Sequence, residues 1–232
     1  LRVIARCGTG LDSVDLQAAS RLGIDVFNTP DAPTQAVAEL TIAHMLNSLR
    51  HISTTDSNMR SGKWTPTMGS LLATKTVGLI GVGRIGSAVA KLAQAFGARV
   101  IGFDPVVSSH SSVELLSLDE VLNQADIVSL HVPINDQTHH IVNASAISRM
   151  KPGSIVVNVS RGGLIDESAL HDALKSQHLS GAALDCFEDE PYSGPLLQLP
   201  GVHVTAHMGS YARETRDLME VEASTNLVNG LR

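Results

Sequence analysis

The sequence predicts an α/β fold built around a doubly wound parallel sheet. Short apolar runs rich in β-branched residues alternate with stretches of helical periodicity. Glycine, proline, asparagine and aspartate mark the joints between these runs. Continuous apolar runs are typical of strands that are buried on both faces, and their alternation with helices is typical of a parallel sheet with helices on either side.

The larger part of the chain contains six candidate strands with helical stretches between them. Each strand candidate is short, apolar and bounded by residues that favour turns. The predicted strands cover Thr76–Ile80, Arg99–Phe103, Asp126–Leu130, Ser154–Asn158, Gly181–Asp185 and Val202–Thr205. The predicted helices cover Arg84–Phe96, Leu118–Gln124, Ala144–Met150 and Glu167–Ser176.

The first segment has a smaller strand–helix–strand pattern. Strands are expected over Arg2–Ala5 and Asp25–Phe27, around a helix over Ser13–Leu22 that ends at Gly23. Leu1 opens directly into an apolar run, so we expect the chain to lack upstream residues.

Two further helices organise the domains. One long helix is expected from Thr34 to about Arg60, as a bridge between domains. Either Thr34 or Asp31 could cap its start. A last helix over Glu214–Leu231 should pack back on the first segment. These elements predict three parts, at residues 1–45, 46–206 and 207–232.

Composition excludes several classes of protein. The chain has 232 residues, of which 43% are hydrophobic and 17% charged, as in ordinary globular proteins. A net charge of −6 argues against a nucleic-acid partner. No apolar run reaches the ~18–20 residues of a membrane span, and no stretch has the layout of a signal peptide. We therefore expect no membrane association.

Cysteine and histidine usage predicts a reducing, cytoplasmic environment and no metal. Two cysteines, Cys7 and Cys186, are too few for a disulfide framework. No cysteine or histidine cluster has the spacing of zinc ligands, and the neighbours His139 and His140 are interpreted as part of a solvated loop.

A glycine-rich loop follows the first strand of the large part. Gly81, Gly83 and Gly86 form the pattern G-x-G-x-x-G between a strand and a helix, which is the context of a dinucleotide fingerprint. The first glycine permits a tight turn, the second lets a pyrophosphate approach the backbone, and the third allows close packing. The free N–H groups of the helix would face the phosphates.

An acidic residue makes this loop specific for NAD. Asp104 ends the next strand, close to the ~20-residue spacing of the fingerprint, where its carboxylate would bind the ribose hydroxyls and repel the 2′-phosphate of NADP. The alternative is a solvated turn residue. Arg84 would contact the pyrophosphate or remain a solvated helix residue. The fold class is accordingly a Rossmann-type sheet that binds NAD.

Three later loops place an arginine, a glutamate and a histidine at one edge of the sheet. Arg161 lies in Asn158–Gly163, Glu190 in Asp185–Pro191 and His207 in Thr205–Ser210. Taken singly, each could be a surface arginine, a solvated acid or an ordinary loop histidine. Together they form a set that can act on a 2-hydroxy or 2-keto acid.

Each member of this set has a chemical role in hydride transfer. The guanidinium of Arg161 would hold the substrate carboxylate. His207 would act as general acid and base near neutral pH, with Glu190 orienting its ring.

These motifs resemble those of the D-isomer-specific 2-hydroxyacid dehydrogenases. The resemblance runs from about Arg2 to the end and includes the segments Arg6–Asp12, Asn28–Pro30, Ala38–Glu39, Gly81–Gly86, Ser160–Gly163, Asp185–Pro191 and His207–Ser210. It implies that the first segment is a partial, flavodoxin-like substrate domain truncated at its N-terminus. It also implies a homodimer or higher homo-oligomer, most simply through the nucleotide domain and its long helix.

The resemblance also implies roles for individual residues. Asp185 would orient the nicotinamide through its carboxamide, Pro133 would shape the loop beside the adenosine, and His131 would be structural. Met208 and Cys186 replace more usual residues of the family without expected harm. The remaining implied cofactor contacts are Thr9, Ile85, Val132, Val159, Ser160 and Ser210.

Arg6 bears on the substrate. Its place before Cys7 resembles the family members that act on 3-phosphoglycerate in serine biosynthesis, in which an arginine there binds the anionic substrate. The alternatives are a glyoxylate, hydroxypyruvate or D-lactate reductase, and an NAD-sensing protein like the corepressors of the superfamily. Without upstream residues, the chain is expected to bind NAD but could lack turnover.

Overall fold

The computed structural model describes residues 1–232, which divide into two compact units. The smaller unit comprises Leu1–Val37 and Met208–Arg232, and the larger one comprises Ala38–His207. The first division falls within helix α2 (Thr34–Arg50), ahead of the boundary at residues 45 and 46 expected from sequence. The second falls one residue after the expected boundary.

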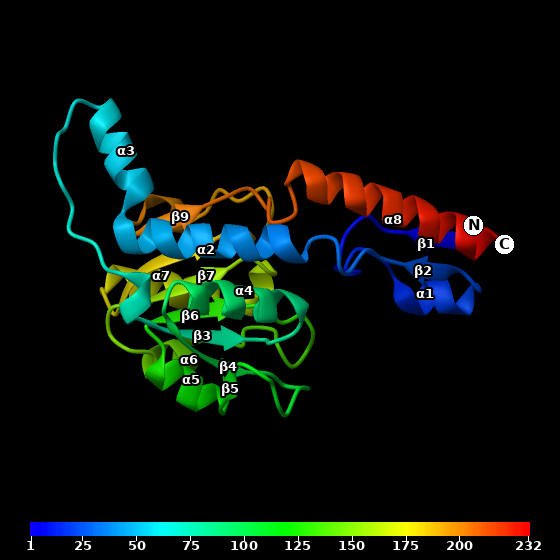
Figure 1. The fold of residues 1–232 in the computed structure, drawn as a ribbon, viewed down its shortest axis with the longest axis horizontal. Helices are drawn as coiled ribbons and strands as arrows, with labels where there is room; N and C mark the ends of the chain where they lie inside the picture. The colour runs from blue at the N-terminus through cyan, green and yellow to red at the C-terminus, as the bar shows by residue number, and fades with distance from the viewer. The chain divides into compact units, whose positions relative to one another are not determined.

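The larger unit contains a seven-stranded, fully parallel sheet in the order β5-β4-β3-β6-β7-β8-β9 (Figure 1). From β3 the chain runs outward in one direction to β5 and then returns to β6 on the other side of β3, so the sheet is doubly wound as predicted. The strands are β3 (Thr76–Ile80), β4 (Arg99–Phe103), β5 (Glu114–Leu115), β6 (Ile127–Leu130), β7 (Ser154–Asn158), β8 (Leu179–Leu184) and β9 (Val202–Val204).

Helices cover the sheet and begin at the residues expected of helix caps. Helix α4 packs on β3 and β4, whereas α5, α6 and α7 contact one another in series. The side chains of Ser117, Asn143 and Asp166 accept hydrogen bonds from the first turns of α5, α6 and α7. The helices are α4 (Arg84–Ala95), α5 (Leu118–Gln124), α6 (Ala144–Arg149) and α7 (Glu167–Lys175), with short 3₁₀ turns η1 (Leu72–Thr74), η2 (Gly162–Leu164) and η3 (Pro195–Gln198).

The hydrophobic core explains why these strands are visible in the sequence. Every residue of β6 and β7 is buried, so neither strand can alternate polar and apolar residues. Ile80, Leu130, Val156 and Leu164 meet in one buried cluster that extends from the sheet to the covering helices. Burial on both faces thus produces the continuous apolar runs.

The long helix predicted from Thr34 to about Arg60 is two helices, so this expectation was wrong. Helix α2 ends at Arg50, and α3 (Ile52–Arg60) begins after His51, whose φ of 53° is left-handed. A left-handed residue cannot continue a right-handed helix. The apolar periodicity runs through this position, and no proline or glycine marks the break.

The smaller unit holds two parallel strands and two helices. Strands β1 (Val3–Ala5) and β2 (Asp25–Phe27) pair directly, and helix α1 (Leu16–Arg21) connects them. The terminal helix α8 (Arg213–Leu231) packs on both strands. Its Asn226 donates a hydrogen bond to the carbonyl of Asn28 at 3.1 Å. The C-terminal tail therefore packs on the first segment of the chain.

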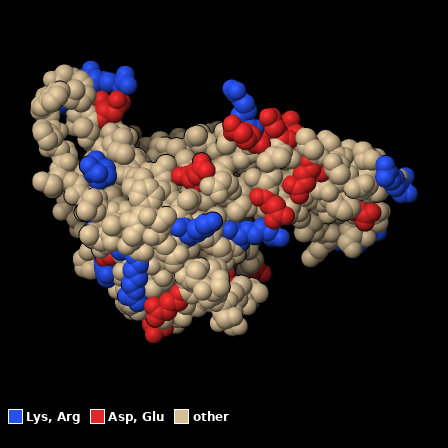
Figure 2. Space-filling view, in the orientation of Figure 1, with Lys and Arg blue, Asp and Glu red and all other residues tan.

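The surface carries a mixture of charges. On the face shown in Figure 2, basic and acidic side chains are interspersed among uncharged residues. No helix of the chain combines the length and apolarity that crossing a membrane requires.

Candidate active site

The carboxyl ends of the strands in the larger unit form one continuous row. Ile80 pairs with Phe103 on one side and with Leu130 on the other. The row continues from Leu130 to Asn158, Leu184 and Val204. The loops that follow these residues consequently emerge at the same edge of the sheet, where open α/β sheets bind ligands. Most of the predicted site residues lie in these loops.

The loop after β3 has the geometry that its glycines predict. Gly81 has a φ of 100°, and a Cβ atom there would lie 2.7 Å from the carbonyl carbon of His131. A Cβ on Gly86 would lie 2.1 Å from the carbonyl oxygen of Gly81. At Gly83, by contrast, a Cβ would point into open space, and no side chain caps the N-terminus of α4 there. The loop therefore leaves backbone N–H groups accessible to an anion such as a pyrophosphate.

Asp104 lies beside this loop, at the end of β4. Its Oδ2 accepts the N–H of Val82 at 2.9 Å, and its Oδ1 accepts the N–H groups of Val106 and Val107. Burial disfavours the charged carboxylate, but the hydrogen bonds from Val82, Val107 and Val106 outweigh it, so the pKa of Asp104 lies below its ordinary value. An ionised carboxylate at this position suits ribose hydroxyls and disfavours a phosphate.

His207 and Glu190 form a directly bonded pair at the far end of the row. His207 Nδ1 lies 2.8 Å from Glu190 Oε2 and 3.0 Å from Oε1. Glu190 also accepts the N–H of Phe187 at 3.0 Å, which fixes the carboxylate on its own loop. Since Nδ1 is engaged, Nε2 is the nitrogen available to exchange a proton with a substrate. Both side chains are partly exposed, as such an exchange requires.

Arg161 lies between the glycine loop and this pair in the order of strands. Its backbone carbonyl accepts a hydrogen bond from Asn158 Nδ2 at 2.7 Å, and its guanidinium donates to the carbonyl of Ser160. Asn158 Oδ1 also accepts the N–H of Ser160. The buried Asn158 thus holds the loop that carries Arg161, a role that the sequence did not reveal.

Asp185 is held by a chain of side-chain hydrogen bonds that the sequence also did not reveal. The Thr205 hydroxyl donates to Asp185 Oδ1 at 2.5 Å, and His44 Nε2 lies 3.1 Å from the Thr205 oxygen. Burial, which outweighs the attraction of Asp185, lowers the pKa of His44. A neutral His44 that donates from Nε2 completes this chain and keeps Asp185 in a fixed orientation.

The loop after β6 joins the glycine loop to the Ser160 loop. The Ser160 hydroxyl donates to the carbonyl of Val132 at 2.8 Å, and the Thr138 hydroxyl donates to that of Pro133. Val132 and Val159 are buried, whereas Arg84 is exposed and Ile85 half-buried at the start of α4. These expected cofactor residues therefore surround one stretch of the edge.

His131 and Cys186 have the environment of structural groups. His131 Nε2 lies 2.9 Å from the Ser129 hydroxyl, and burial lowers the pKa of His131 to about 3. Burial raises the pKa of the Cys186 thiol, so this thiol is not a nucleophile at neutral pH.

Three expected contacts belong to the smaller unit. Thr9 is exposed, and its carbonyl accepts a hydrogen bond from Asn28 at 2.7 Å. The Arg6 guanidinium lies against Gly8, where a Cβ would be 2.5 Å from Nη1. Ser210 is half-buried next to Gly209.

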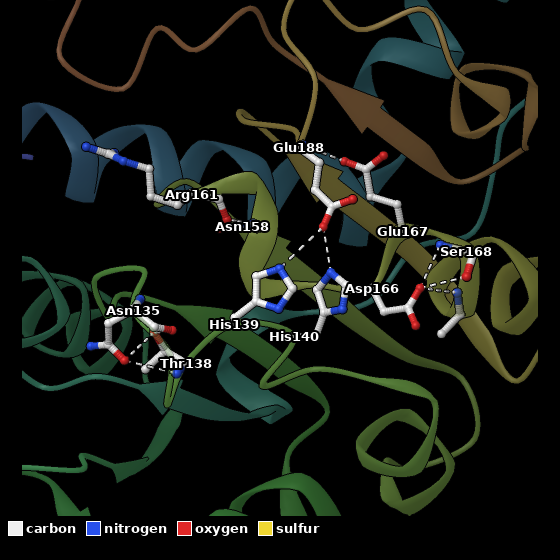
Figure 3. Close-up of polar contacts among 11 residues, drawn as sticks. Asn135, Thr138, His139, His140, Asn158, Arg161, Asp166, Glu167, Ser168 and Glu188 are labelled. Atoms are coloured by element: carbon white, nitrogen blue, oxygen red, sulfur yellow. Dashed lines mark hydrogen bonds and ion pairs between the residues drawn. The ribbon is translucent and has the colours of Figure 1, made fainter. Parts of the chain in front are cut away.

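The pair His139 and His140 does not form a simple solvated loop. Figure 3 shows both imidazoles directed at the carboxylate of Glu188, with the Arg161 side chain pointing away from them. His140 Nε2 lies 2.5 Å from Glu188 Oε1. The sequence could not indicate this contact, because the residues are far apart along the chain and follow different strands.

Comparisons with known proteins show the family of this chain. Residues 42–209 match the family described as D-isomer specific 2-hydroxyacid dehydrogenase, NAD binding domain. The chain is 44% identical to a D-3-phosphoglycerate dehydrogenase of Methanocaldococcus jannaschii, over 93% of this chain and 43% of that protein. It is 42% identical to a hydroxypyruvate reductase of Thermotoga maritima, over 96% of this chain and 75% of that protein.

A solved structure extends the similarity to the fold. The crystal structure of a glyoxylate reductase from Paecilomyes thermophila superposes with a TM-score of 0.96 at 34% identity, covering 100% of this chain and 73% of that one. The chain thus spans less than half of the first relative and about three quarters of the other two.

Proposed function

Because the chain belongs to the D-isomer specific 2-hydroxyacid dehydrogenase family, we propose that the protein is an NAD-dependent oxidoreductase. It transfers a hydride between C2 of a D-2-hydroxy acid and nicotinamide. The observation that carries this proposal is the His207–Glu190 pair, bonded at 2.8 Å on the same sheet edge as the glycine loop. A histidine held by a carboxylate is suited to general acid–base catalysis.

Three side chains divide the chemistry of oxidation. Arg161 binds the substrate carboxylate and so presents C2 to the site. His207 Nε2 takes the proton of the C2 hydroxyl as the C–O bond becomes a carbonyl, and Glu190 stabilises the imidazolium that forms. NAD, when bound, accepts the hydride that leaves C2. In the reductive direction, His207 returns the proton to the oxygen.

The loops that follow the strands at this edge of the sheet would hold the cofactor. The N–H groups at Gly83 and the first turn of α4 would hold the pyrophosphate of NAD, together with Arg84 and Ile85. Asp104 binds the ribose hydroxyls and selects NAD over NADP. Asp185, held by Thr205, orients the nicotinamide. The other proposed contacts are Thr9, Val132, Pro133, Val159, Ser160 and Ser210.

The preferred substrate is 3-phosphoglycerate. Arg6 supports this choice, because its place before Cys7 resembles that of an arginine in the family members that act on this anionic substrate. The relative from M. jannaschii carries the corresponding name. The relatives named hydroxypyruvate reductase and glyoxylate reductase support the alternative of a smaller keto acid.

A kinetic comparison tests both the reaction and the substrate. The full-length protein should oxidise or reduce at least one member of a panel of 3-phosphoglycerate, D-lactate, glyoxylate and hydroxypyruvate with NAD(H), with the highest kcat/KM for 3-phosphoglycerate. His207→Ala should lower kcat by ~10²-fold or more while NAD binding persists. An unchanged kcat would remove His207 from its proposed role, and a preference for another acid would overturn the substrate.

The assembly proposed is a homodimer through the larger unit. Helix α3 and the segment after it stand away from the sheet in Figure 1. They expose Trp64, Met68 and Leu71, whose burial against a second copy would be favourable. Both cysteines are free thiols, which supports a cytoplasmic location.

A further inference from the structure

A second cluster of polar side chains lies outside the proposed catalytic set. It comprises His139, His140 and Glu188, whose candidate ligand atoms all lie within 4.8 Å of one another. The Nε2 atoms of both histidines are directed at Glu188 Oε1, at 3.9 Å for His139 and 2.5 Å for His140 (Figure 3). Two imidazole nitrogens and a carboxylate oxygen thus converge on one point.

The backbone arranges the two histidines before any ligand binds. His140 has a left-handed φ of 50°, which is uncommon for a residue other than glycine. The two rings stack with centroids 3.9 Å apart instead of diverging. The main-chain N–H groups of His139 and His140 donate to the carbonyls of Asn135 and Gly163, respectively, both at 2.8 Å. These hydrogen bonds hold the backbone segment that carries both rings.

The main chain of Glu188 is also held by a hydrogen bond. The N–H of Glu188 donates to Glu167 Oε1 at 2.9 Å. Glu167 lies close enough to Glu188, Asp189 and His140 for their charges to act on it. Three acids around two imidazoles make a local excess of negative charge, which favours a cation over an anion.

This donor set matches a divalent transition-metal ion of the zinc class. Zn²⁺ binds imidazole nitrogen and carboxylate oxygen at ~2.0–2.2 Å, so donors around a tetrahedral ion lie roughly 3.3–3.6 Å apart. The distances of 2.5 Å and 3.9 Å to Glu188 lie on either side of that value. All three side chains are partly exposed, so they can make the small adjustment and an ion can reach them.

We propose that His139, His140 and Glu188 bind one divalent transition-metal ion, for which zinc is the representative. The ion displaces the proton between His140 and Glu188, and water or Glu167 completes its coordination. The expectation of no metal was based on the spacing of ligands along the sequence. That spacing cannot reveal a contact between separate loops.

The site would join the loop after β6, which carries His139 and His140, to the loop that carries Glu188 and Glu190. A Cβ on Gly162 would lie 1.8 Å from the carbonyl carbon of Phe187, so the Arg161 loop and the Glu188 loop are in close backbone contact. Glu188 is also two residues before Glu190. A bound metal ion would therefore hold these loops together. His207 would not be one of its ligands.

Titration with Zn²⁺ by calorimetry and with Co²⁺ by visible absorption tests the site in the full-length, untagged protein. The wild type should bind one ion per chain, and Co²⁺ should give the absorption of a tetrahedral nitrogen–oxygen site. The double variant His139→Asn with His140→Asn should weaken metal binding at least ~10-fold, and so should the single variant Glu188→Gln. His171→Asn, which removes another histidine next to an acid, is the matched control and should bind as the wild type does.

The metal ion could instead bind at the His207–Glu190 pair, and the variant His207→Asn distinguishes this location from the proposed one. Retention of binding in His207→Asn, with loss in the cluster variants, supports the proposal. The proposal is overturned if the wild type binds no metal, or if folded cluster variants, checked by circular dichroism, bind it as tightly as the wild type. Because the readout is metal binding, its failure is separate from failure of the dehydrogenase proposal.

Discussion

At the scale of single residues, His207 shows how the backbone serves the proposed chemistry. Its φ of 50° is left-handed, and its N–H donates to the carbonyl of Asp185 at 2.7 Å. A left-handed residue other than glycine costs roughly 1–2 kcal/mol, so this conformation persists only because its surroundings enforce it. The same hydrogen bond ties the proposed acid–base residue to the residue proposed to orient nicotinamide.

His131 makes a prediction about stability and pH. Burial of its ring lowers the folded-state pKa to about 3, whereas an unfolded histidine titrates near ~6.5. The unfolded chain therefore binds the proton first, and stability is complete above pH ~6.5 and falls as the pH decreases below it. Between pH 7 and pH 5, His131 should account for a loss of up to about 2 kcal/mol in the free energy of unfolding.

Urea unfolding at these two pH values measures this effect. His131→Gln, which can still bond Ser129, should lose less stability on acidification than the wild type. Burial also lowers the pKa of His44 and of His203, but both residues are present in both proteins, so their contributions cancel in the comparison. His171→Gln should behave as the wild type. Equal losses in His131→Gln and the wild type would contradict the role of burial.

At the scale of elements, the close contact between two loops is the sharpest constraint. A Cβ on Gly162 would lie 1.8–2.2 Å from backbone atoms of Phe187 and Glu188. Relieving this clash would require the backbone to move. Gly162→Ala should therefore separate the Arg161 loop from the Glu190 loop and lower kcat by on the order of 10²-fold, as ~1 Å misplacements do.

The neighbouring glycine supplies the control for this prediction. A Cβ on Gly163 would lie no closer than 3.4 Å to Ile134 and 3.5 Å to His139, which is ordinary contact. Gly163→Ala should keep kcat within a few-fold of the wild type, measured in the same assay and with thermal unfolding of both variants. Similar kcat values in the two variants would show that the loop contact does not position the site.

The strands whose bounds the sequence predicts well have buried interiors. The bounds of β3, β4 and β7 match the prediction, because each is a buried apolar run between turn residues. Strand β8 begins at Leu179, two residues earlier than expected, since the exposed Ser180 interrupts the pattern. The two-residue β5 was not predicted, because so short a strand has no pattern.

Parts of the candidate site were also beyond sequence reasoning. Glycines and residues at the ends of strands indicated the loops of the site, because these signals lie within short segments of the sequence. The supports Asn158, Thr205 and His44 depend on contacts between distant segments, as does the approach of Glu188 to His140. Such contacts become visible only when the order of the strands is known.

At the scale of the whole molecule, the proposed cofactor loop and acid–base pair both belong to the larger unit. The same unit exposes Trp64 at 81% and Met68 at 92%. If these side chains are buried between copies, light scattering of the full-length protein should give the mass of a dimer. Trp64→Asp together with Met68→Asp should shift it toward the monomer without unfolding. A monomeric wild type would contradict the proposed assembly.

The most direct test of the central claim follows the hydrogen from C2. The full-length protein is incubated with NAD and the proposed D-2-hydroxy acid deuterated at C2, and the dinucleotide is analysed by mass spectrometry. Direct hydride transfer predicts a reduced dinucleotide that carries one deuterium with the D-isomer and no reduced product with the L-isomer. Reduced dinucleotide without deuterium, or none at all with every acid of the panel, would contradict the account.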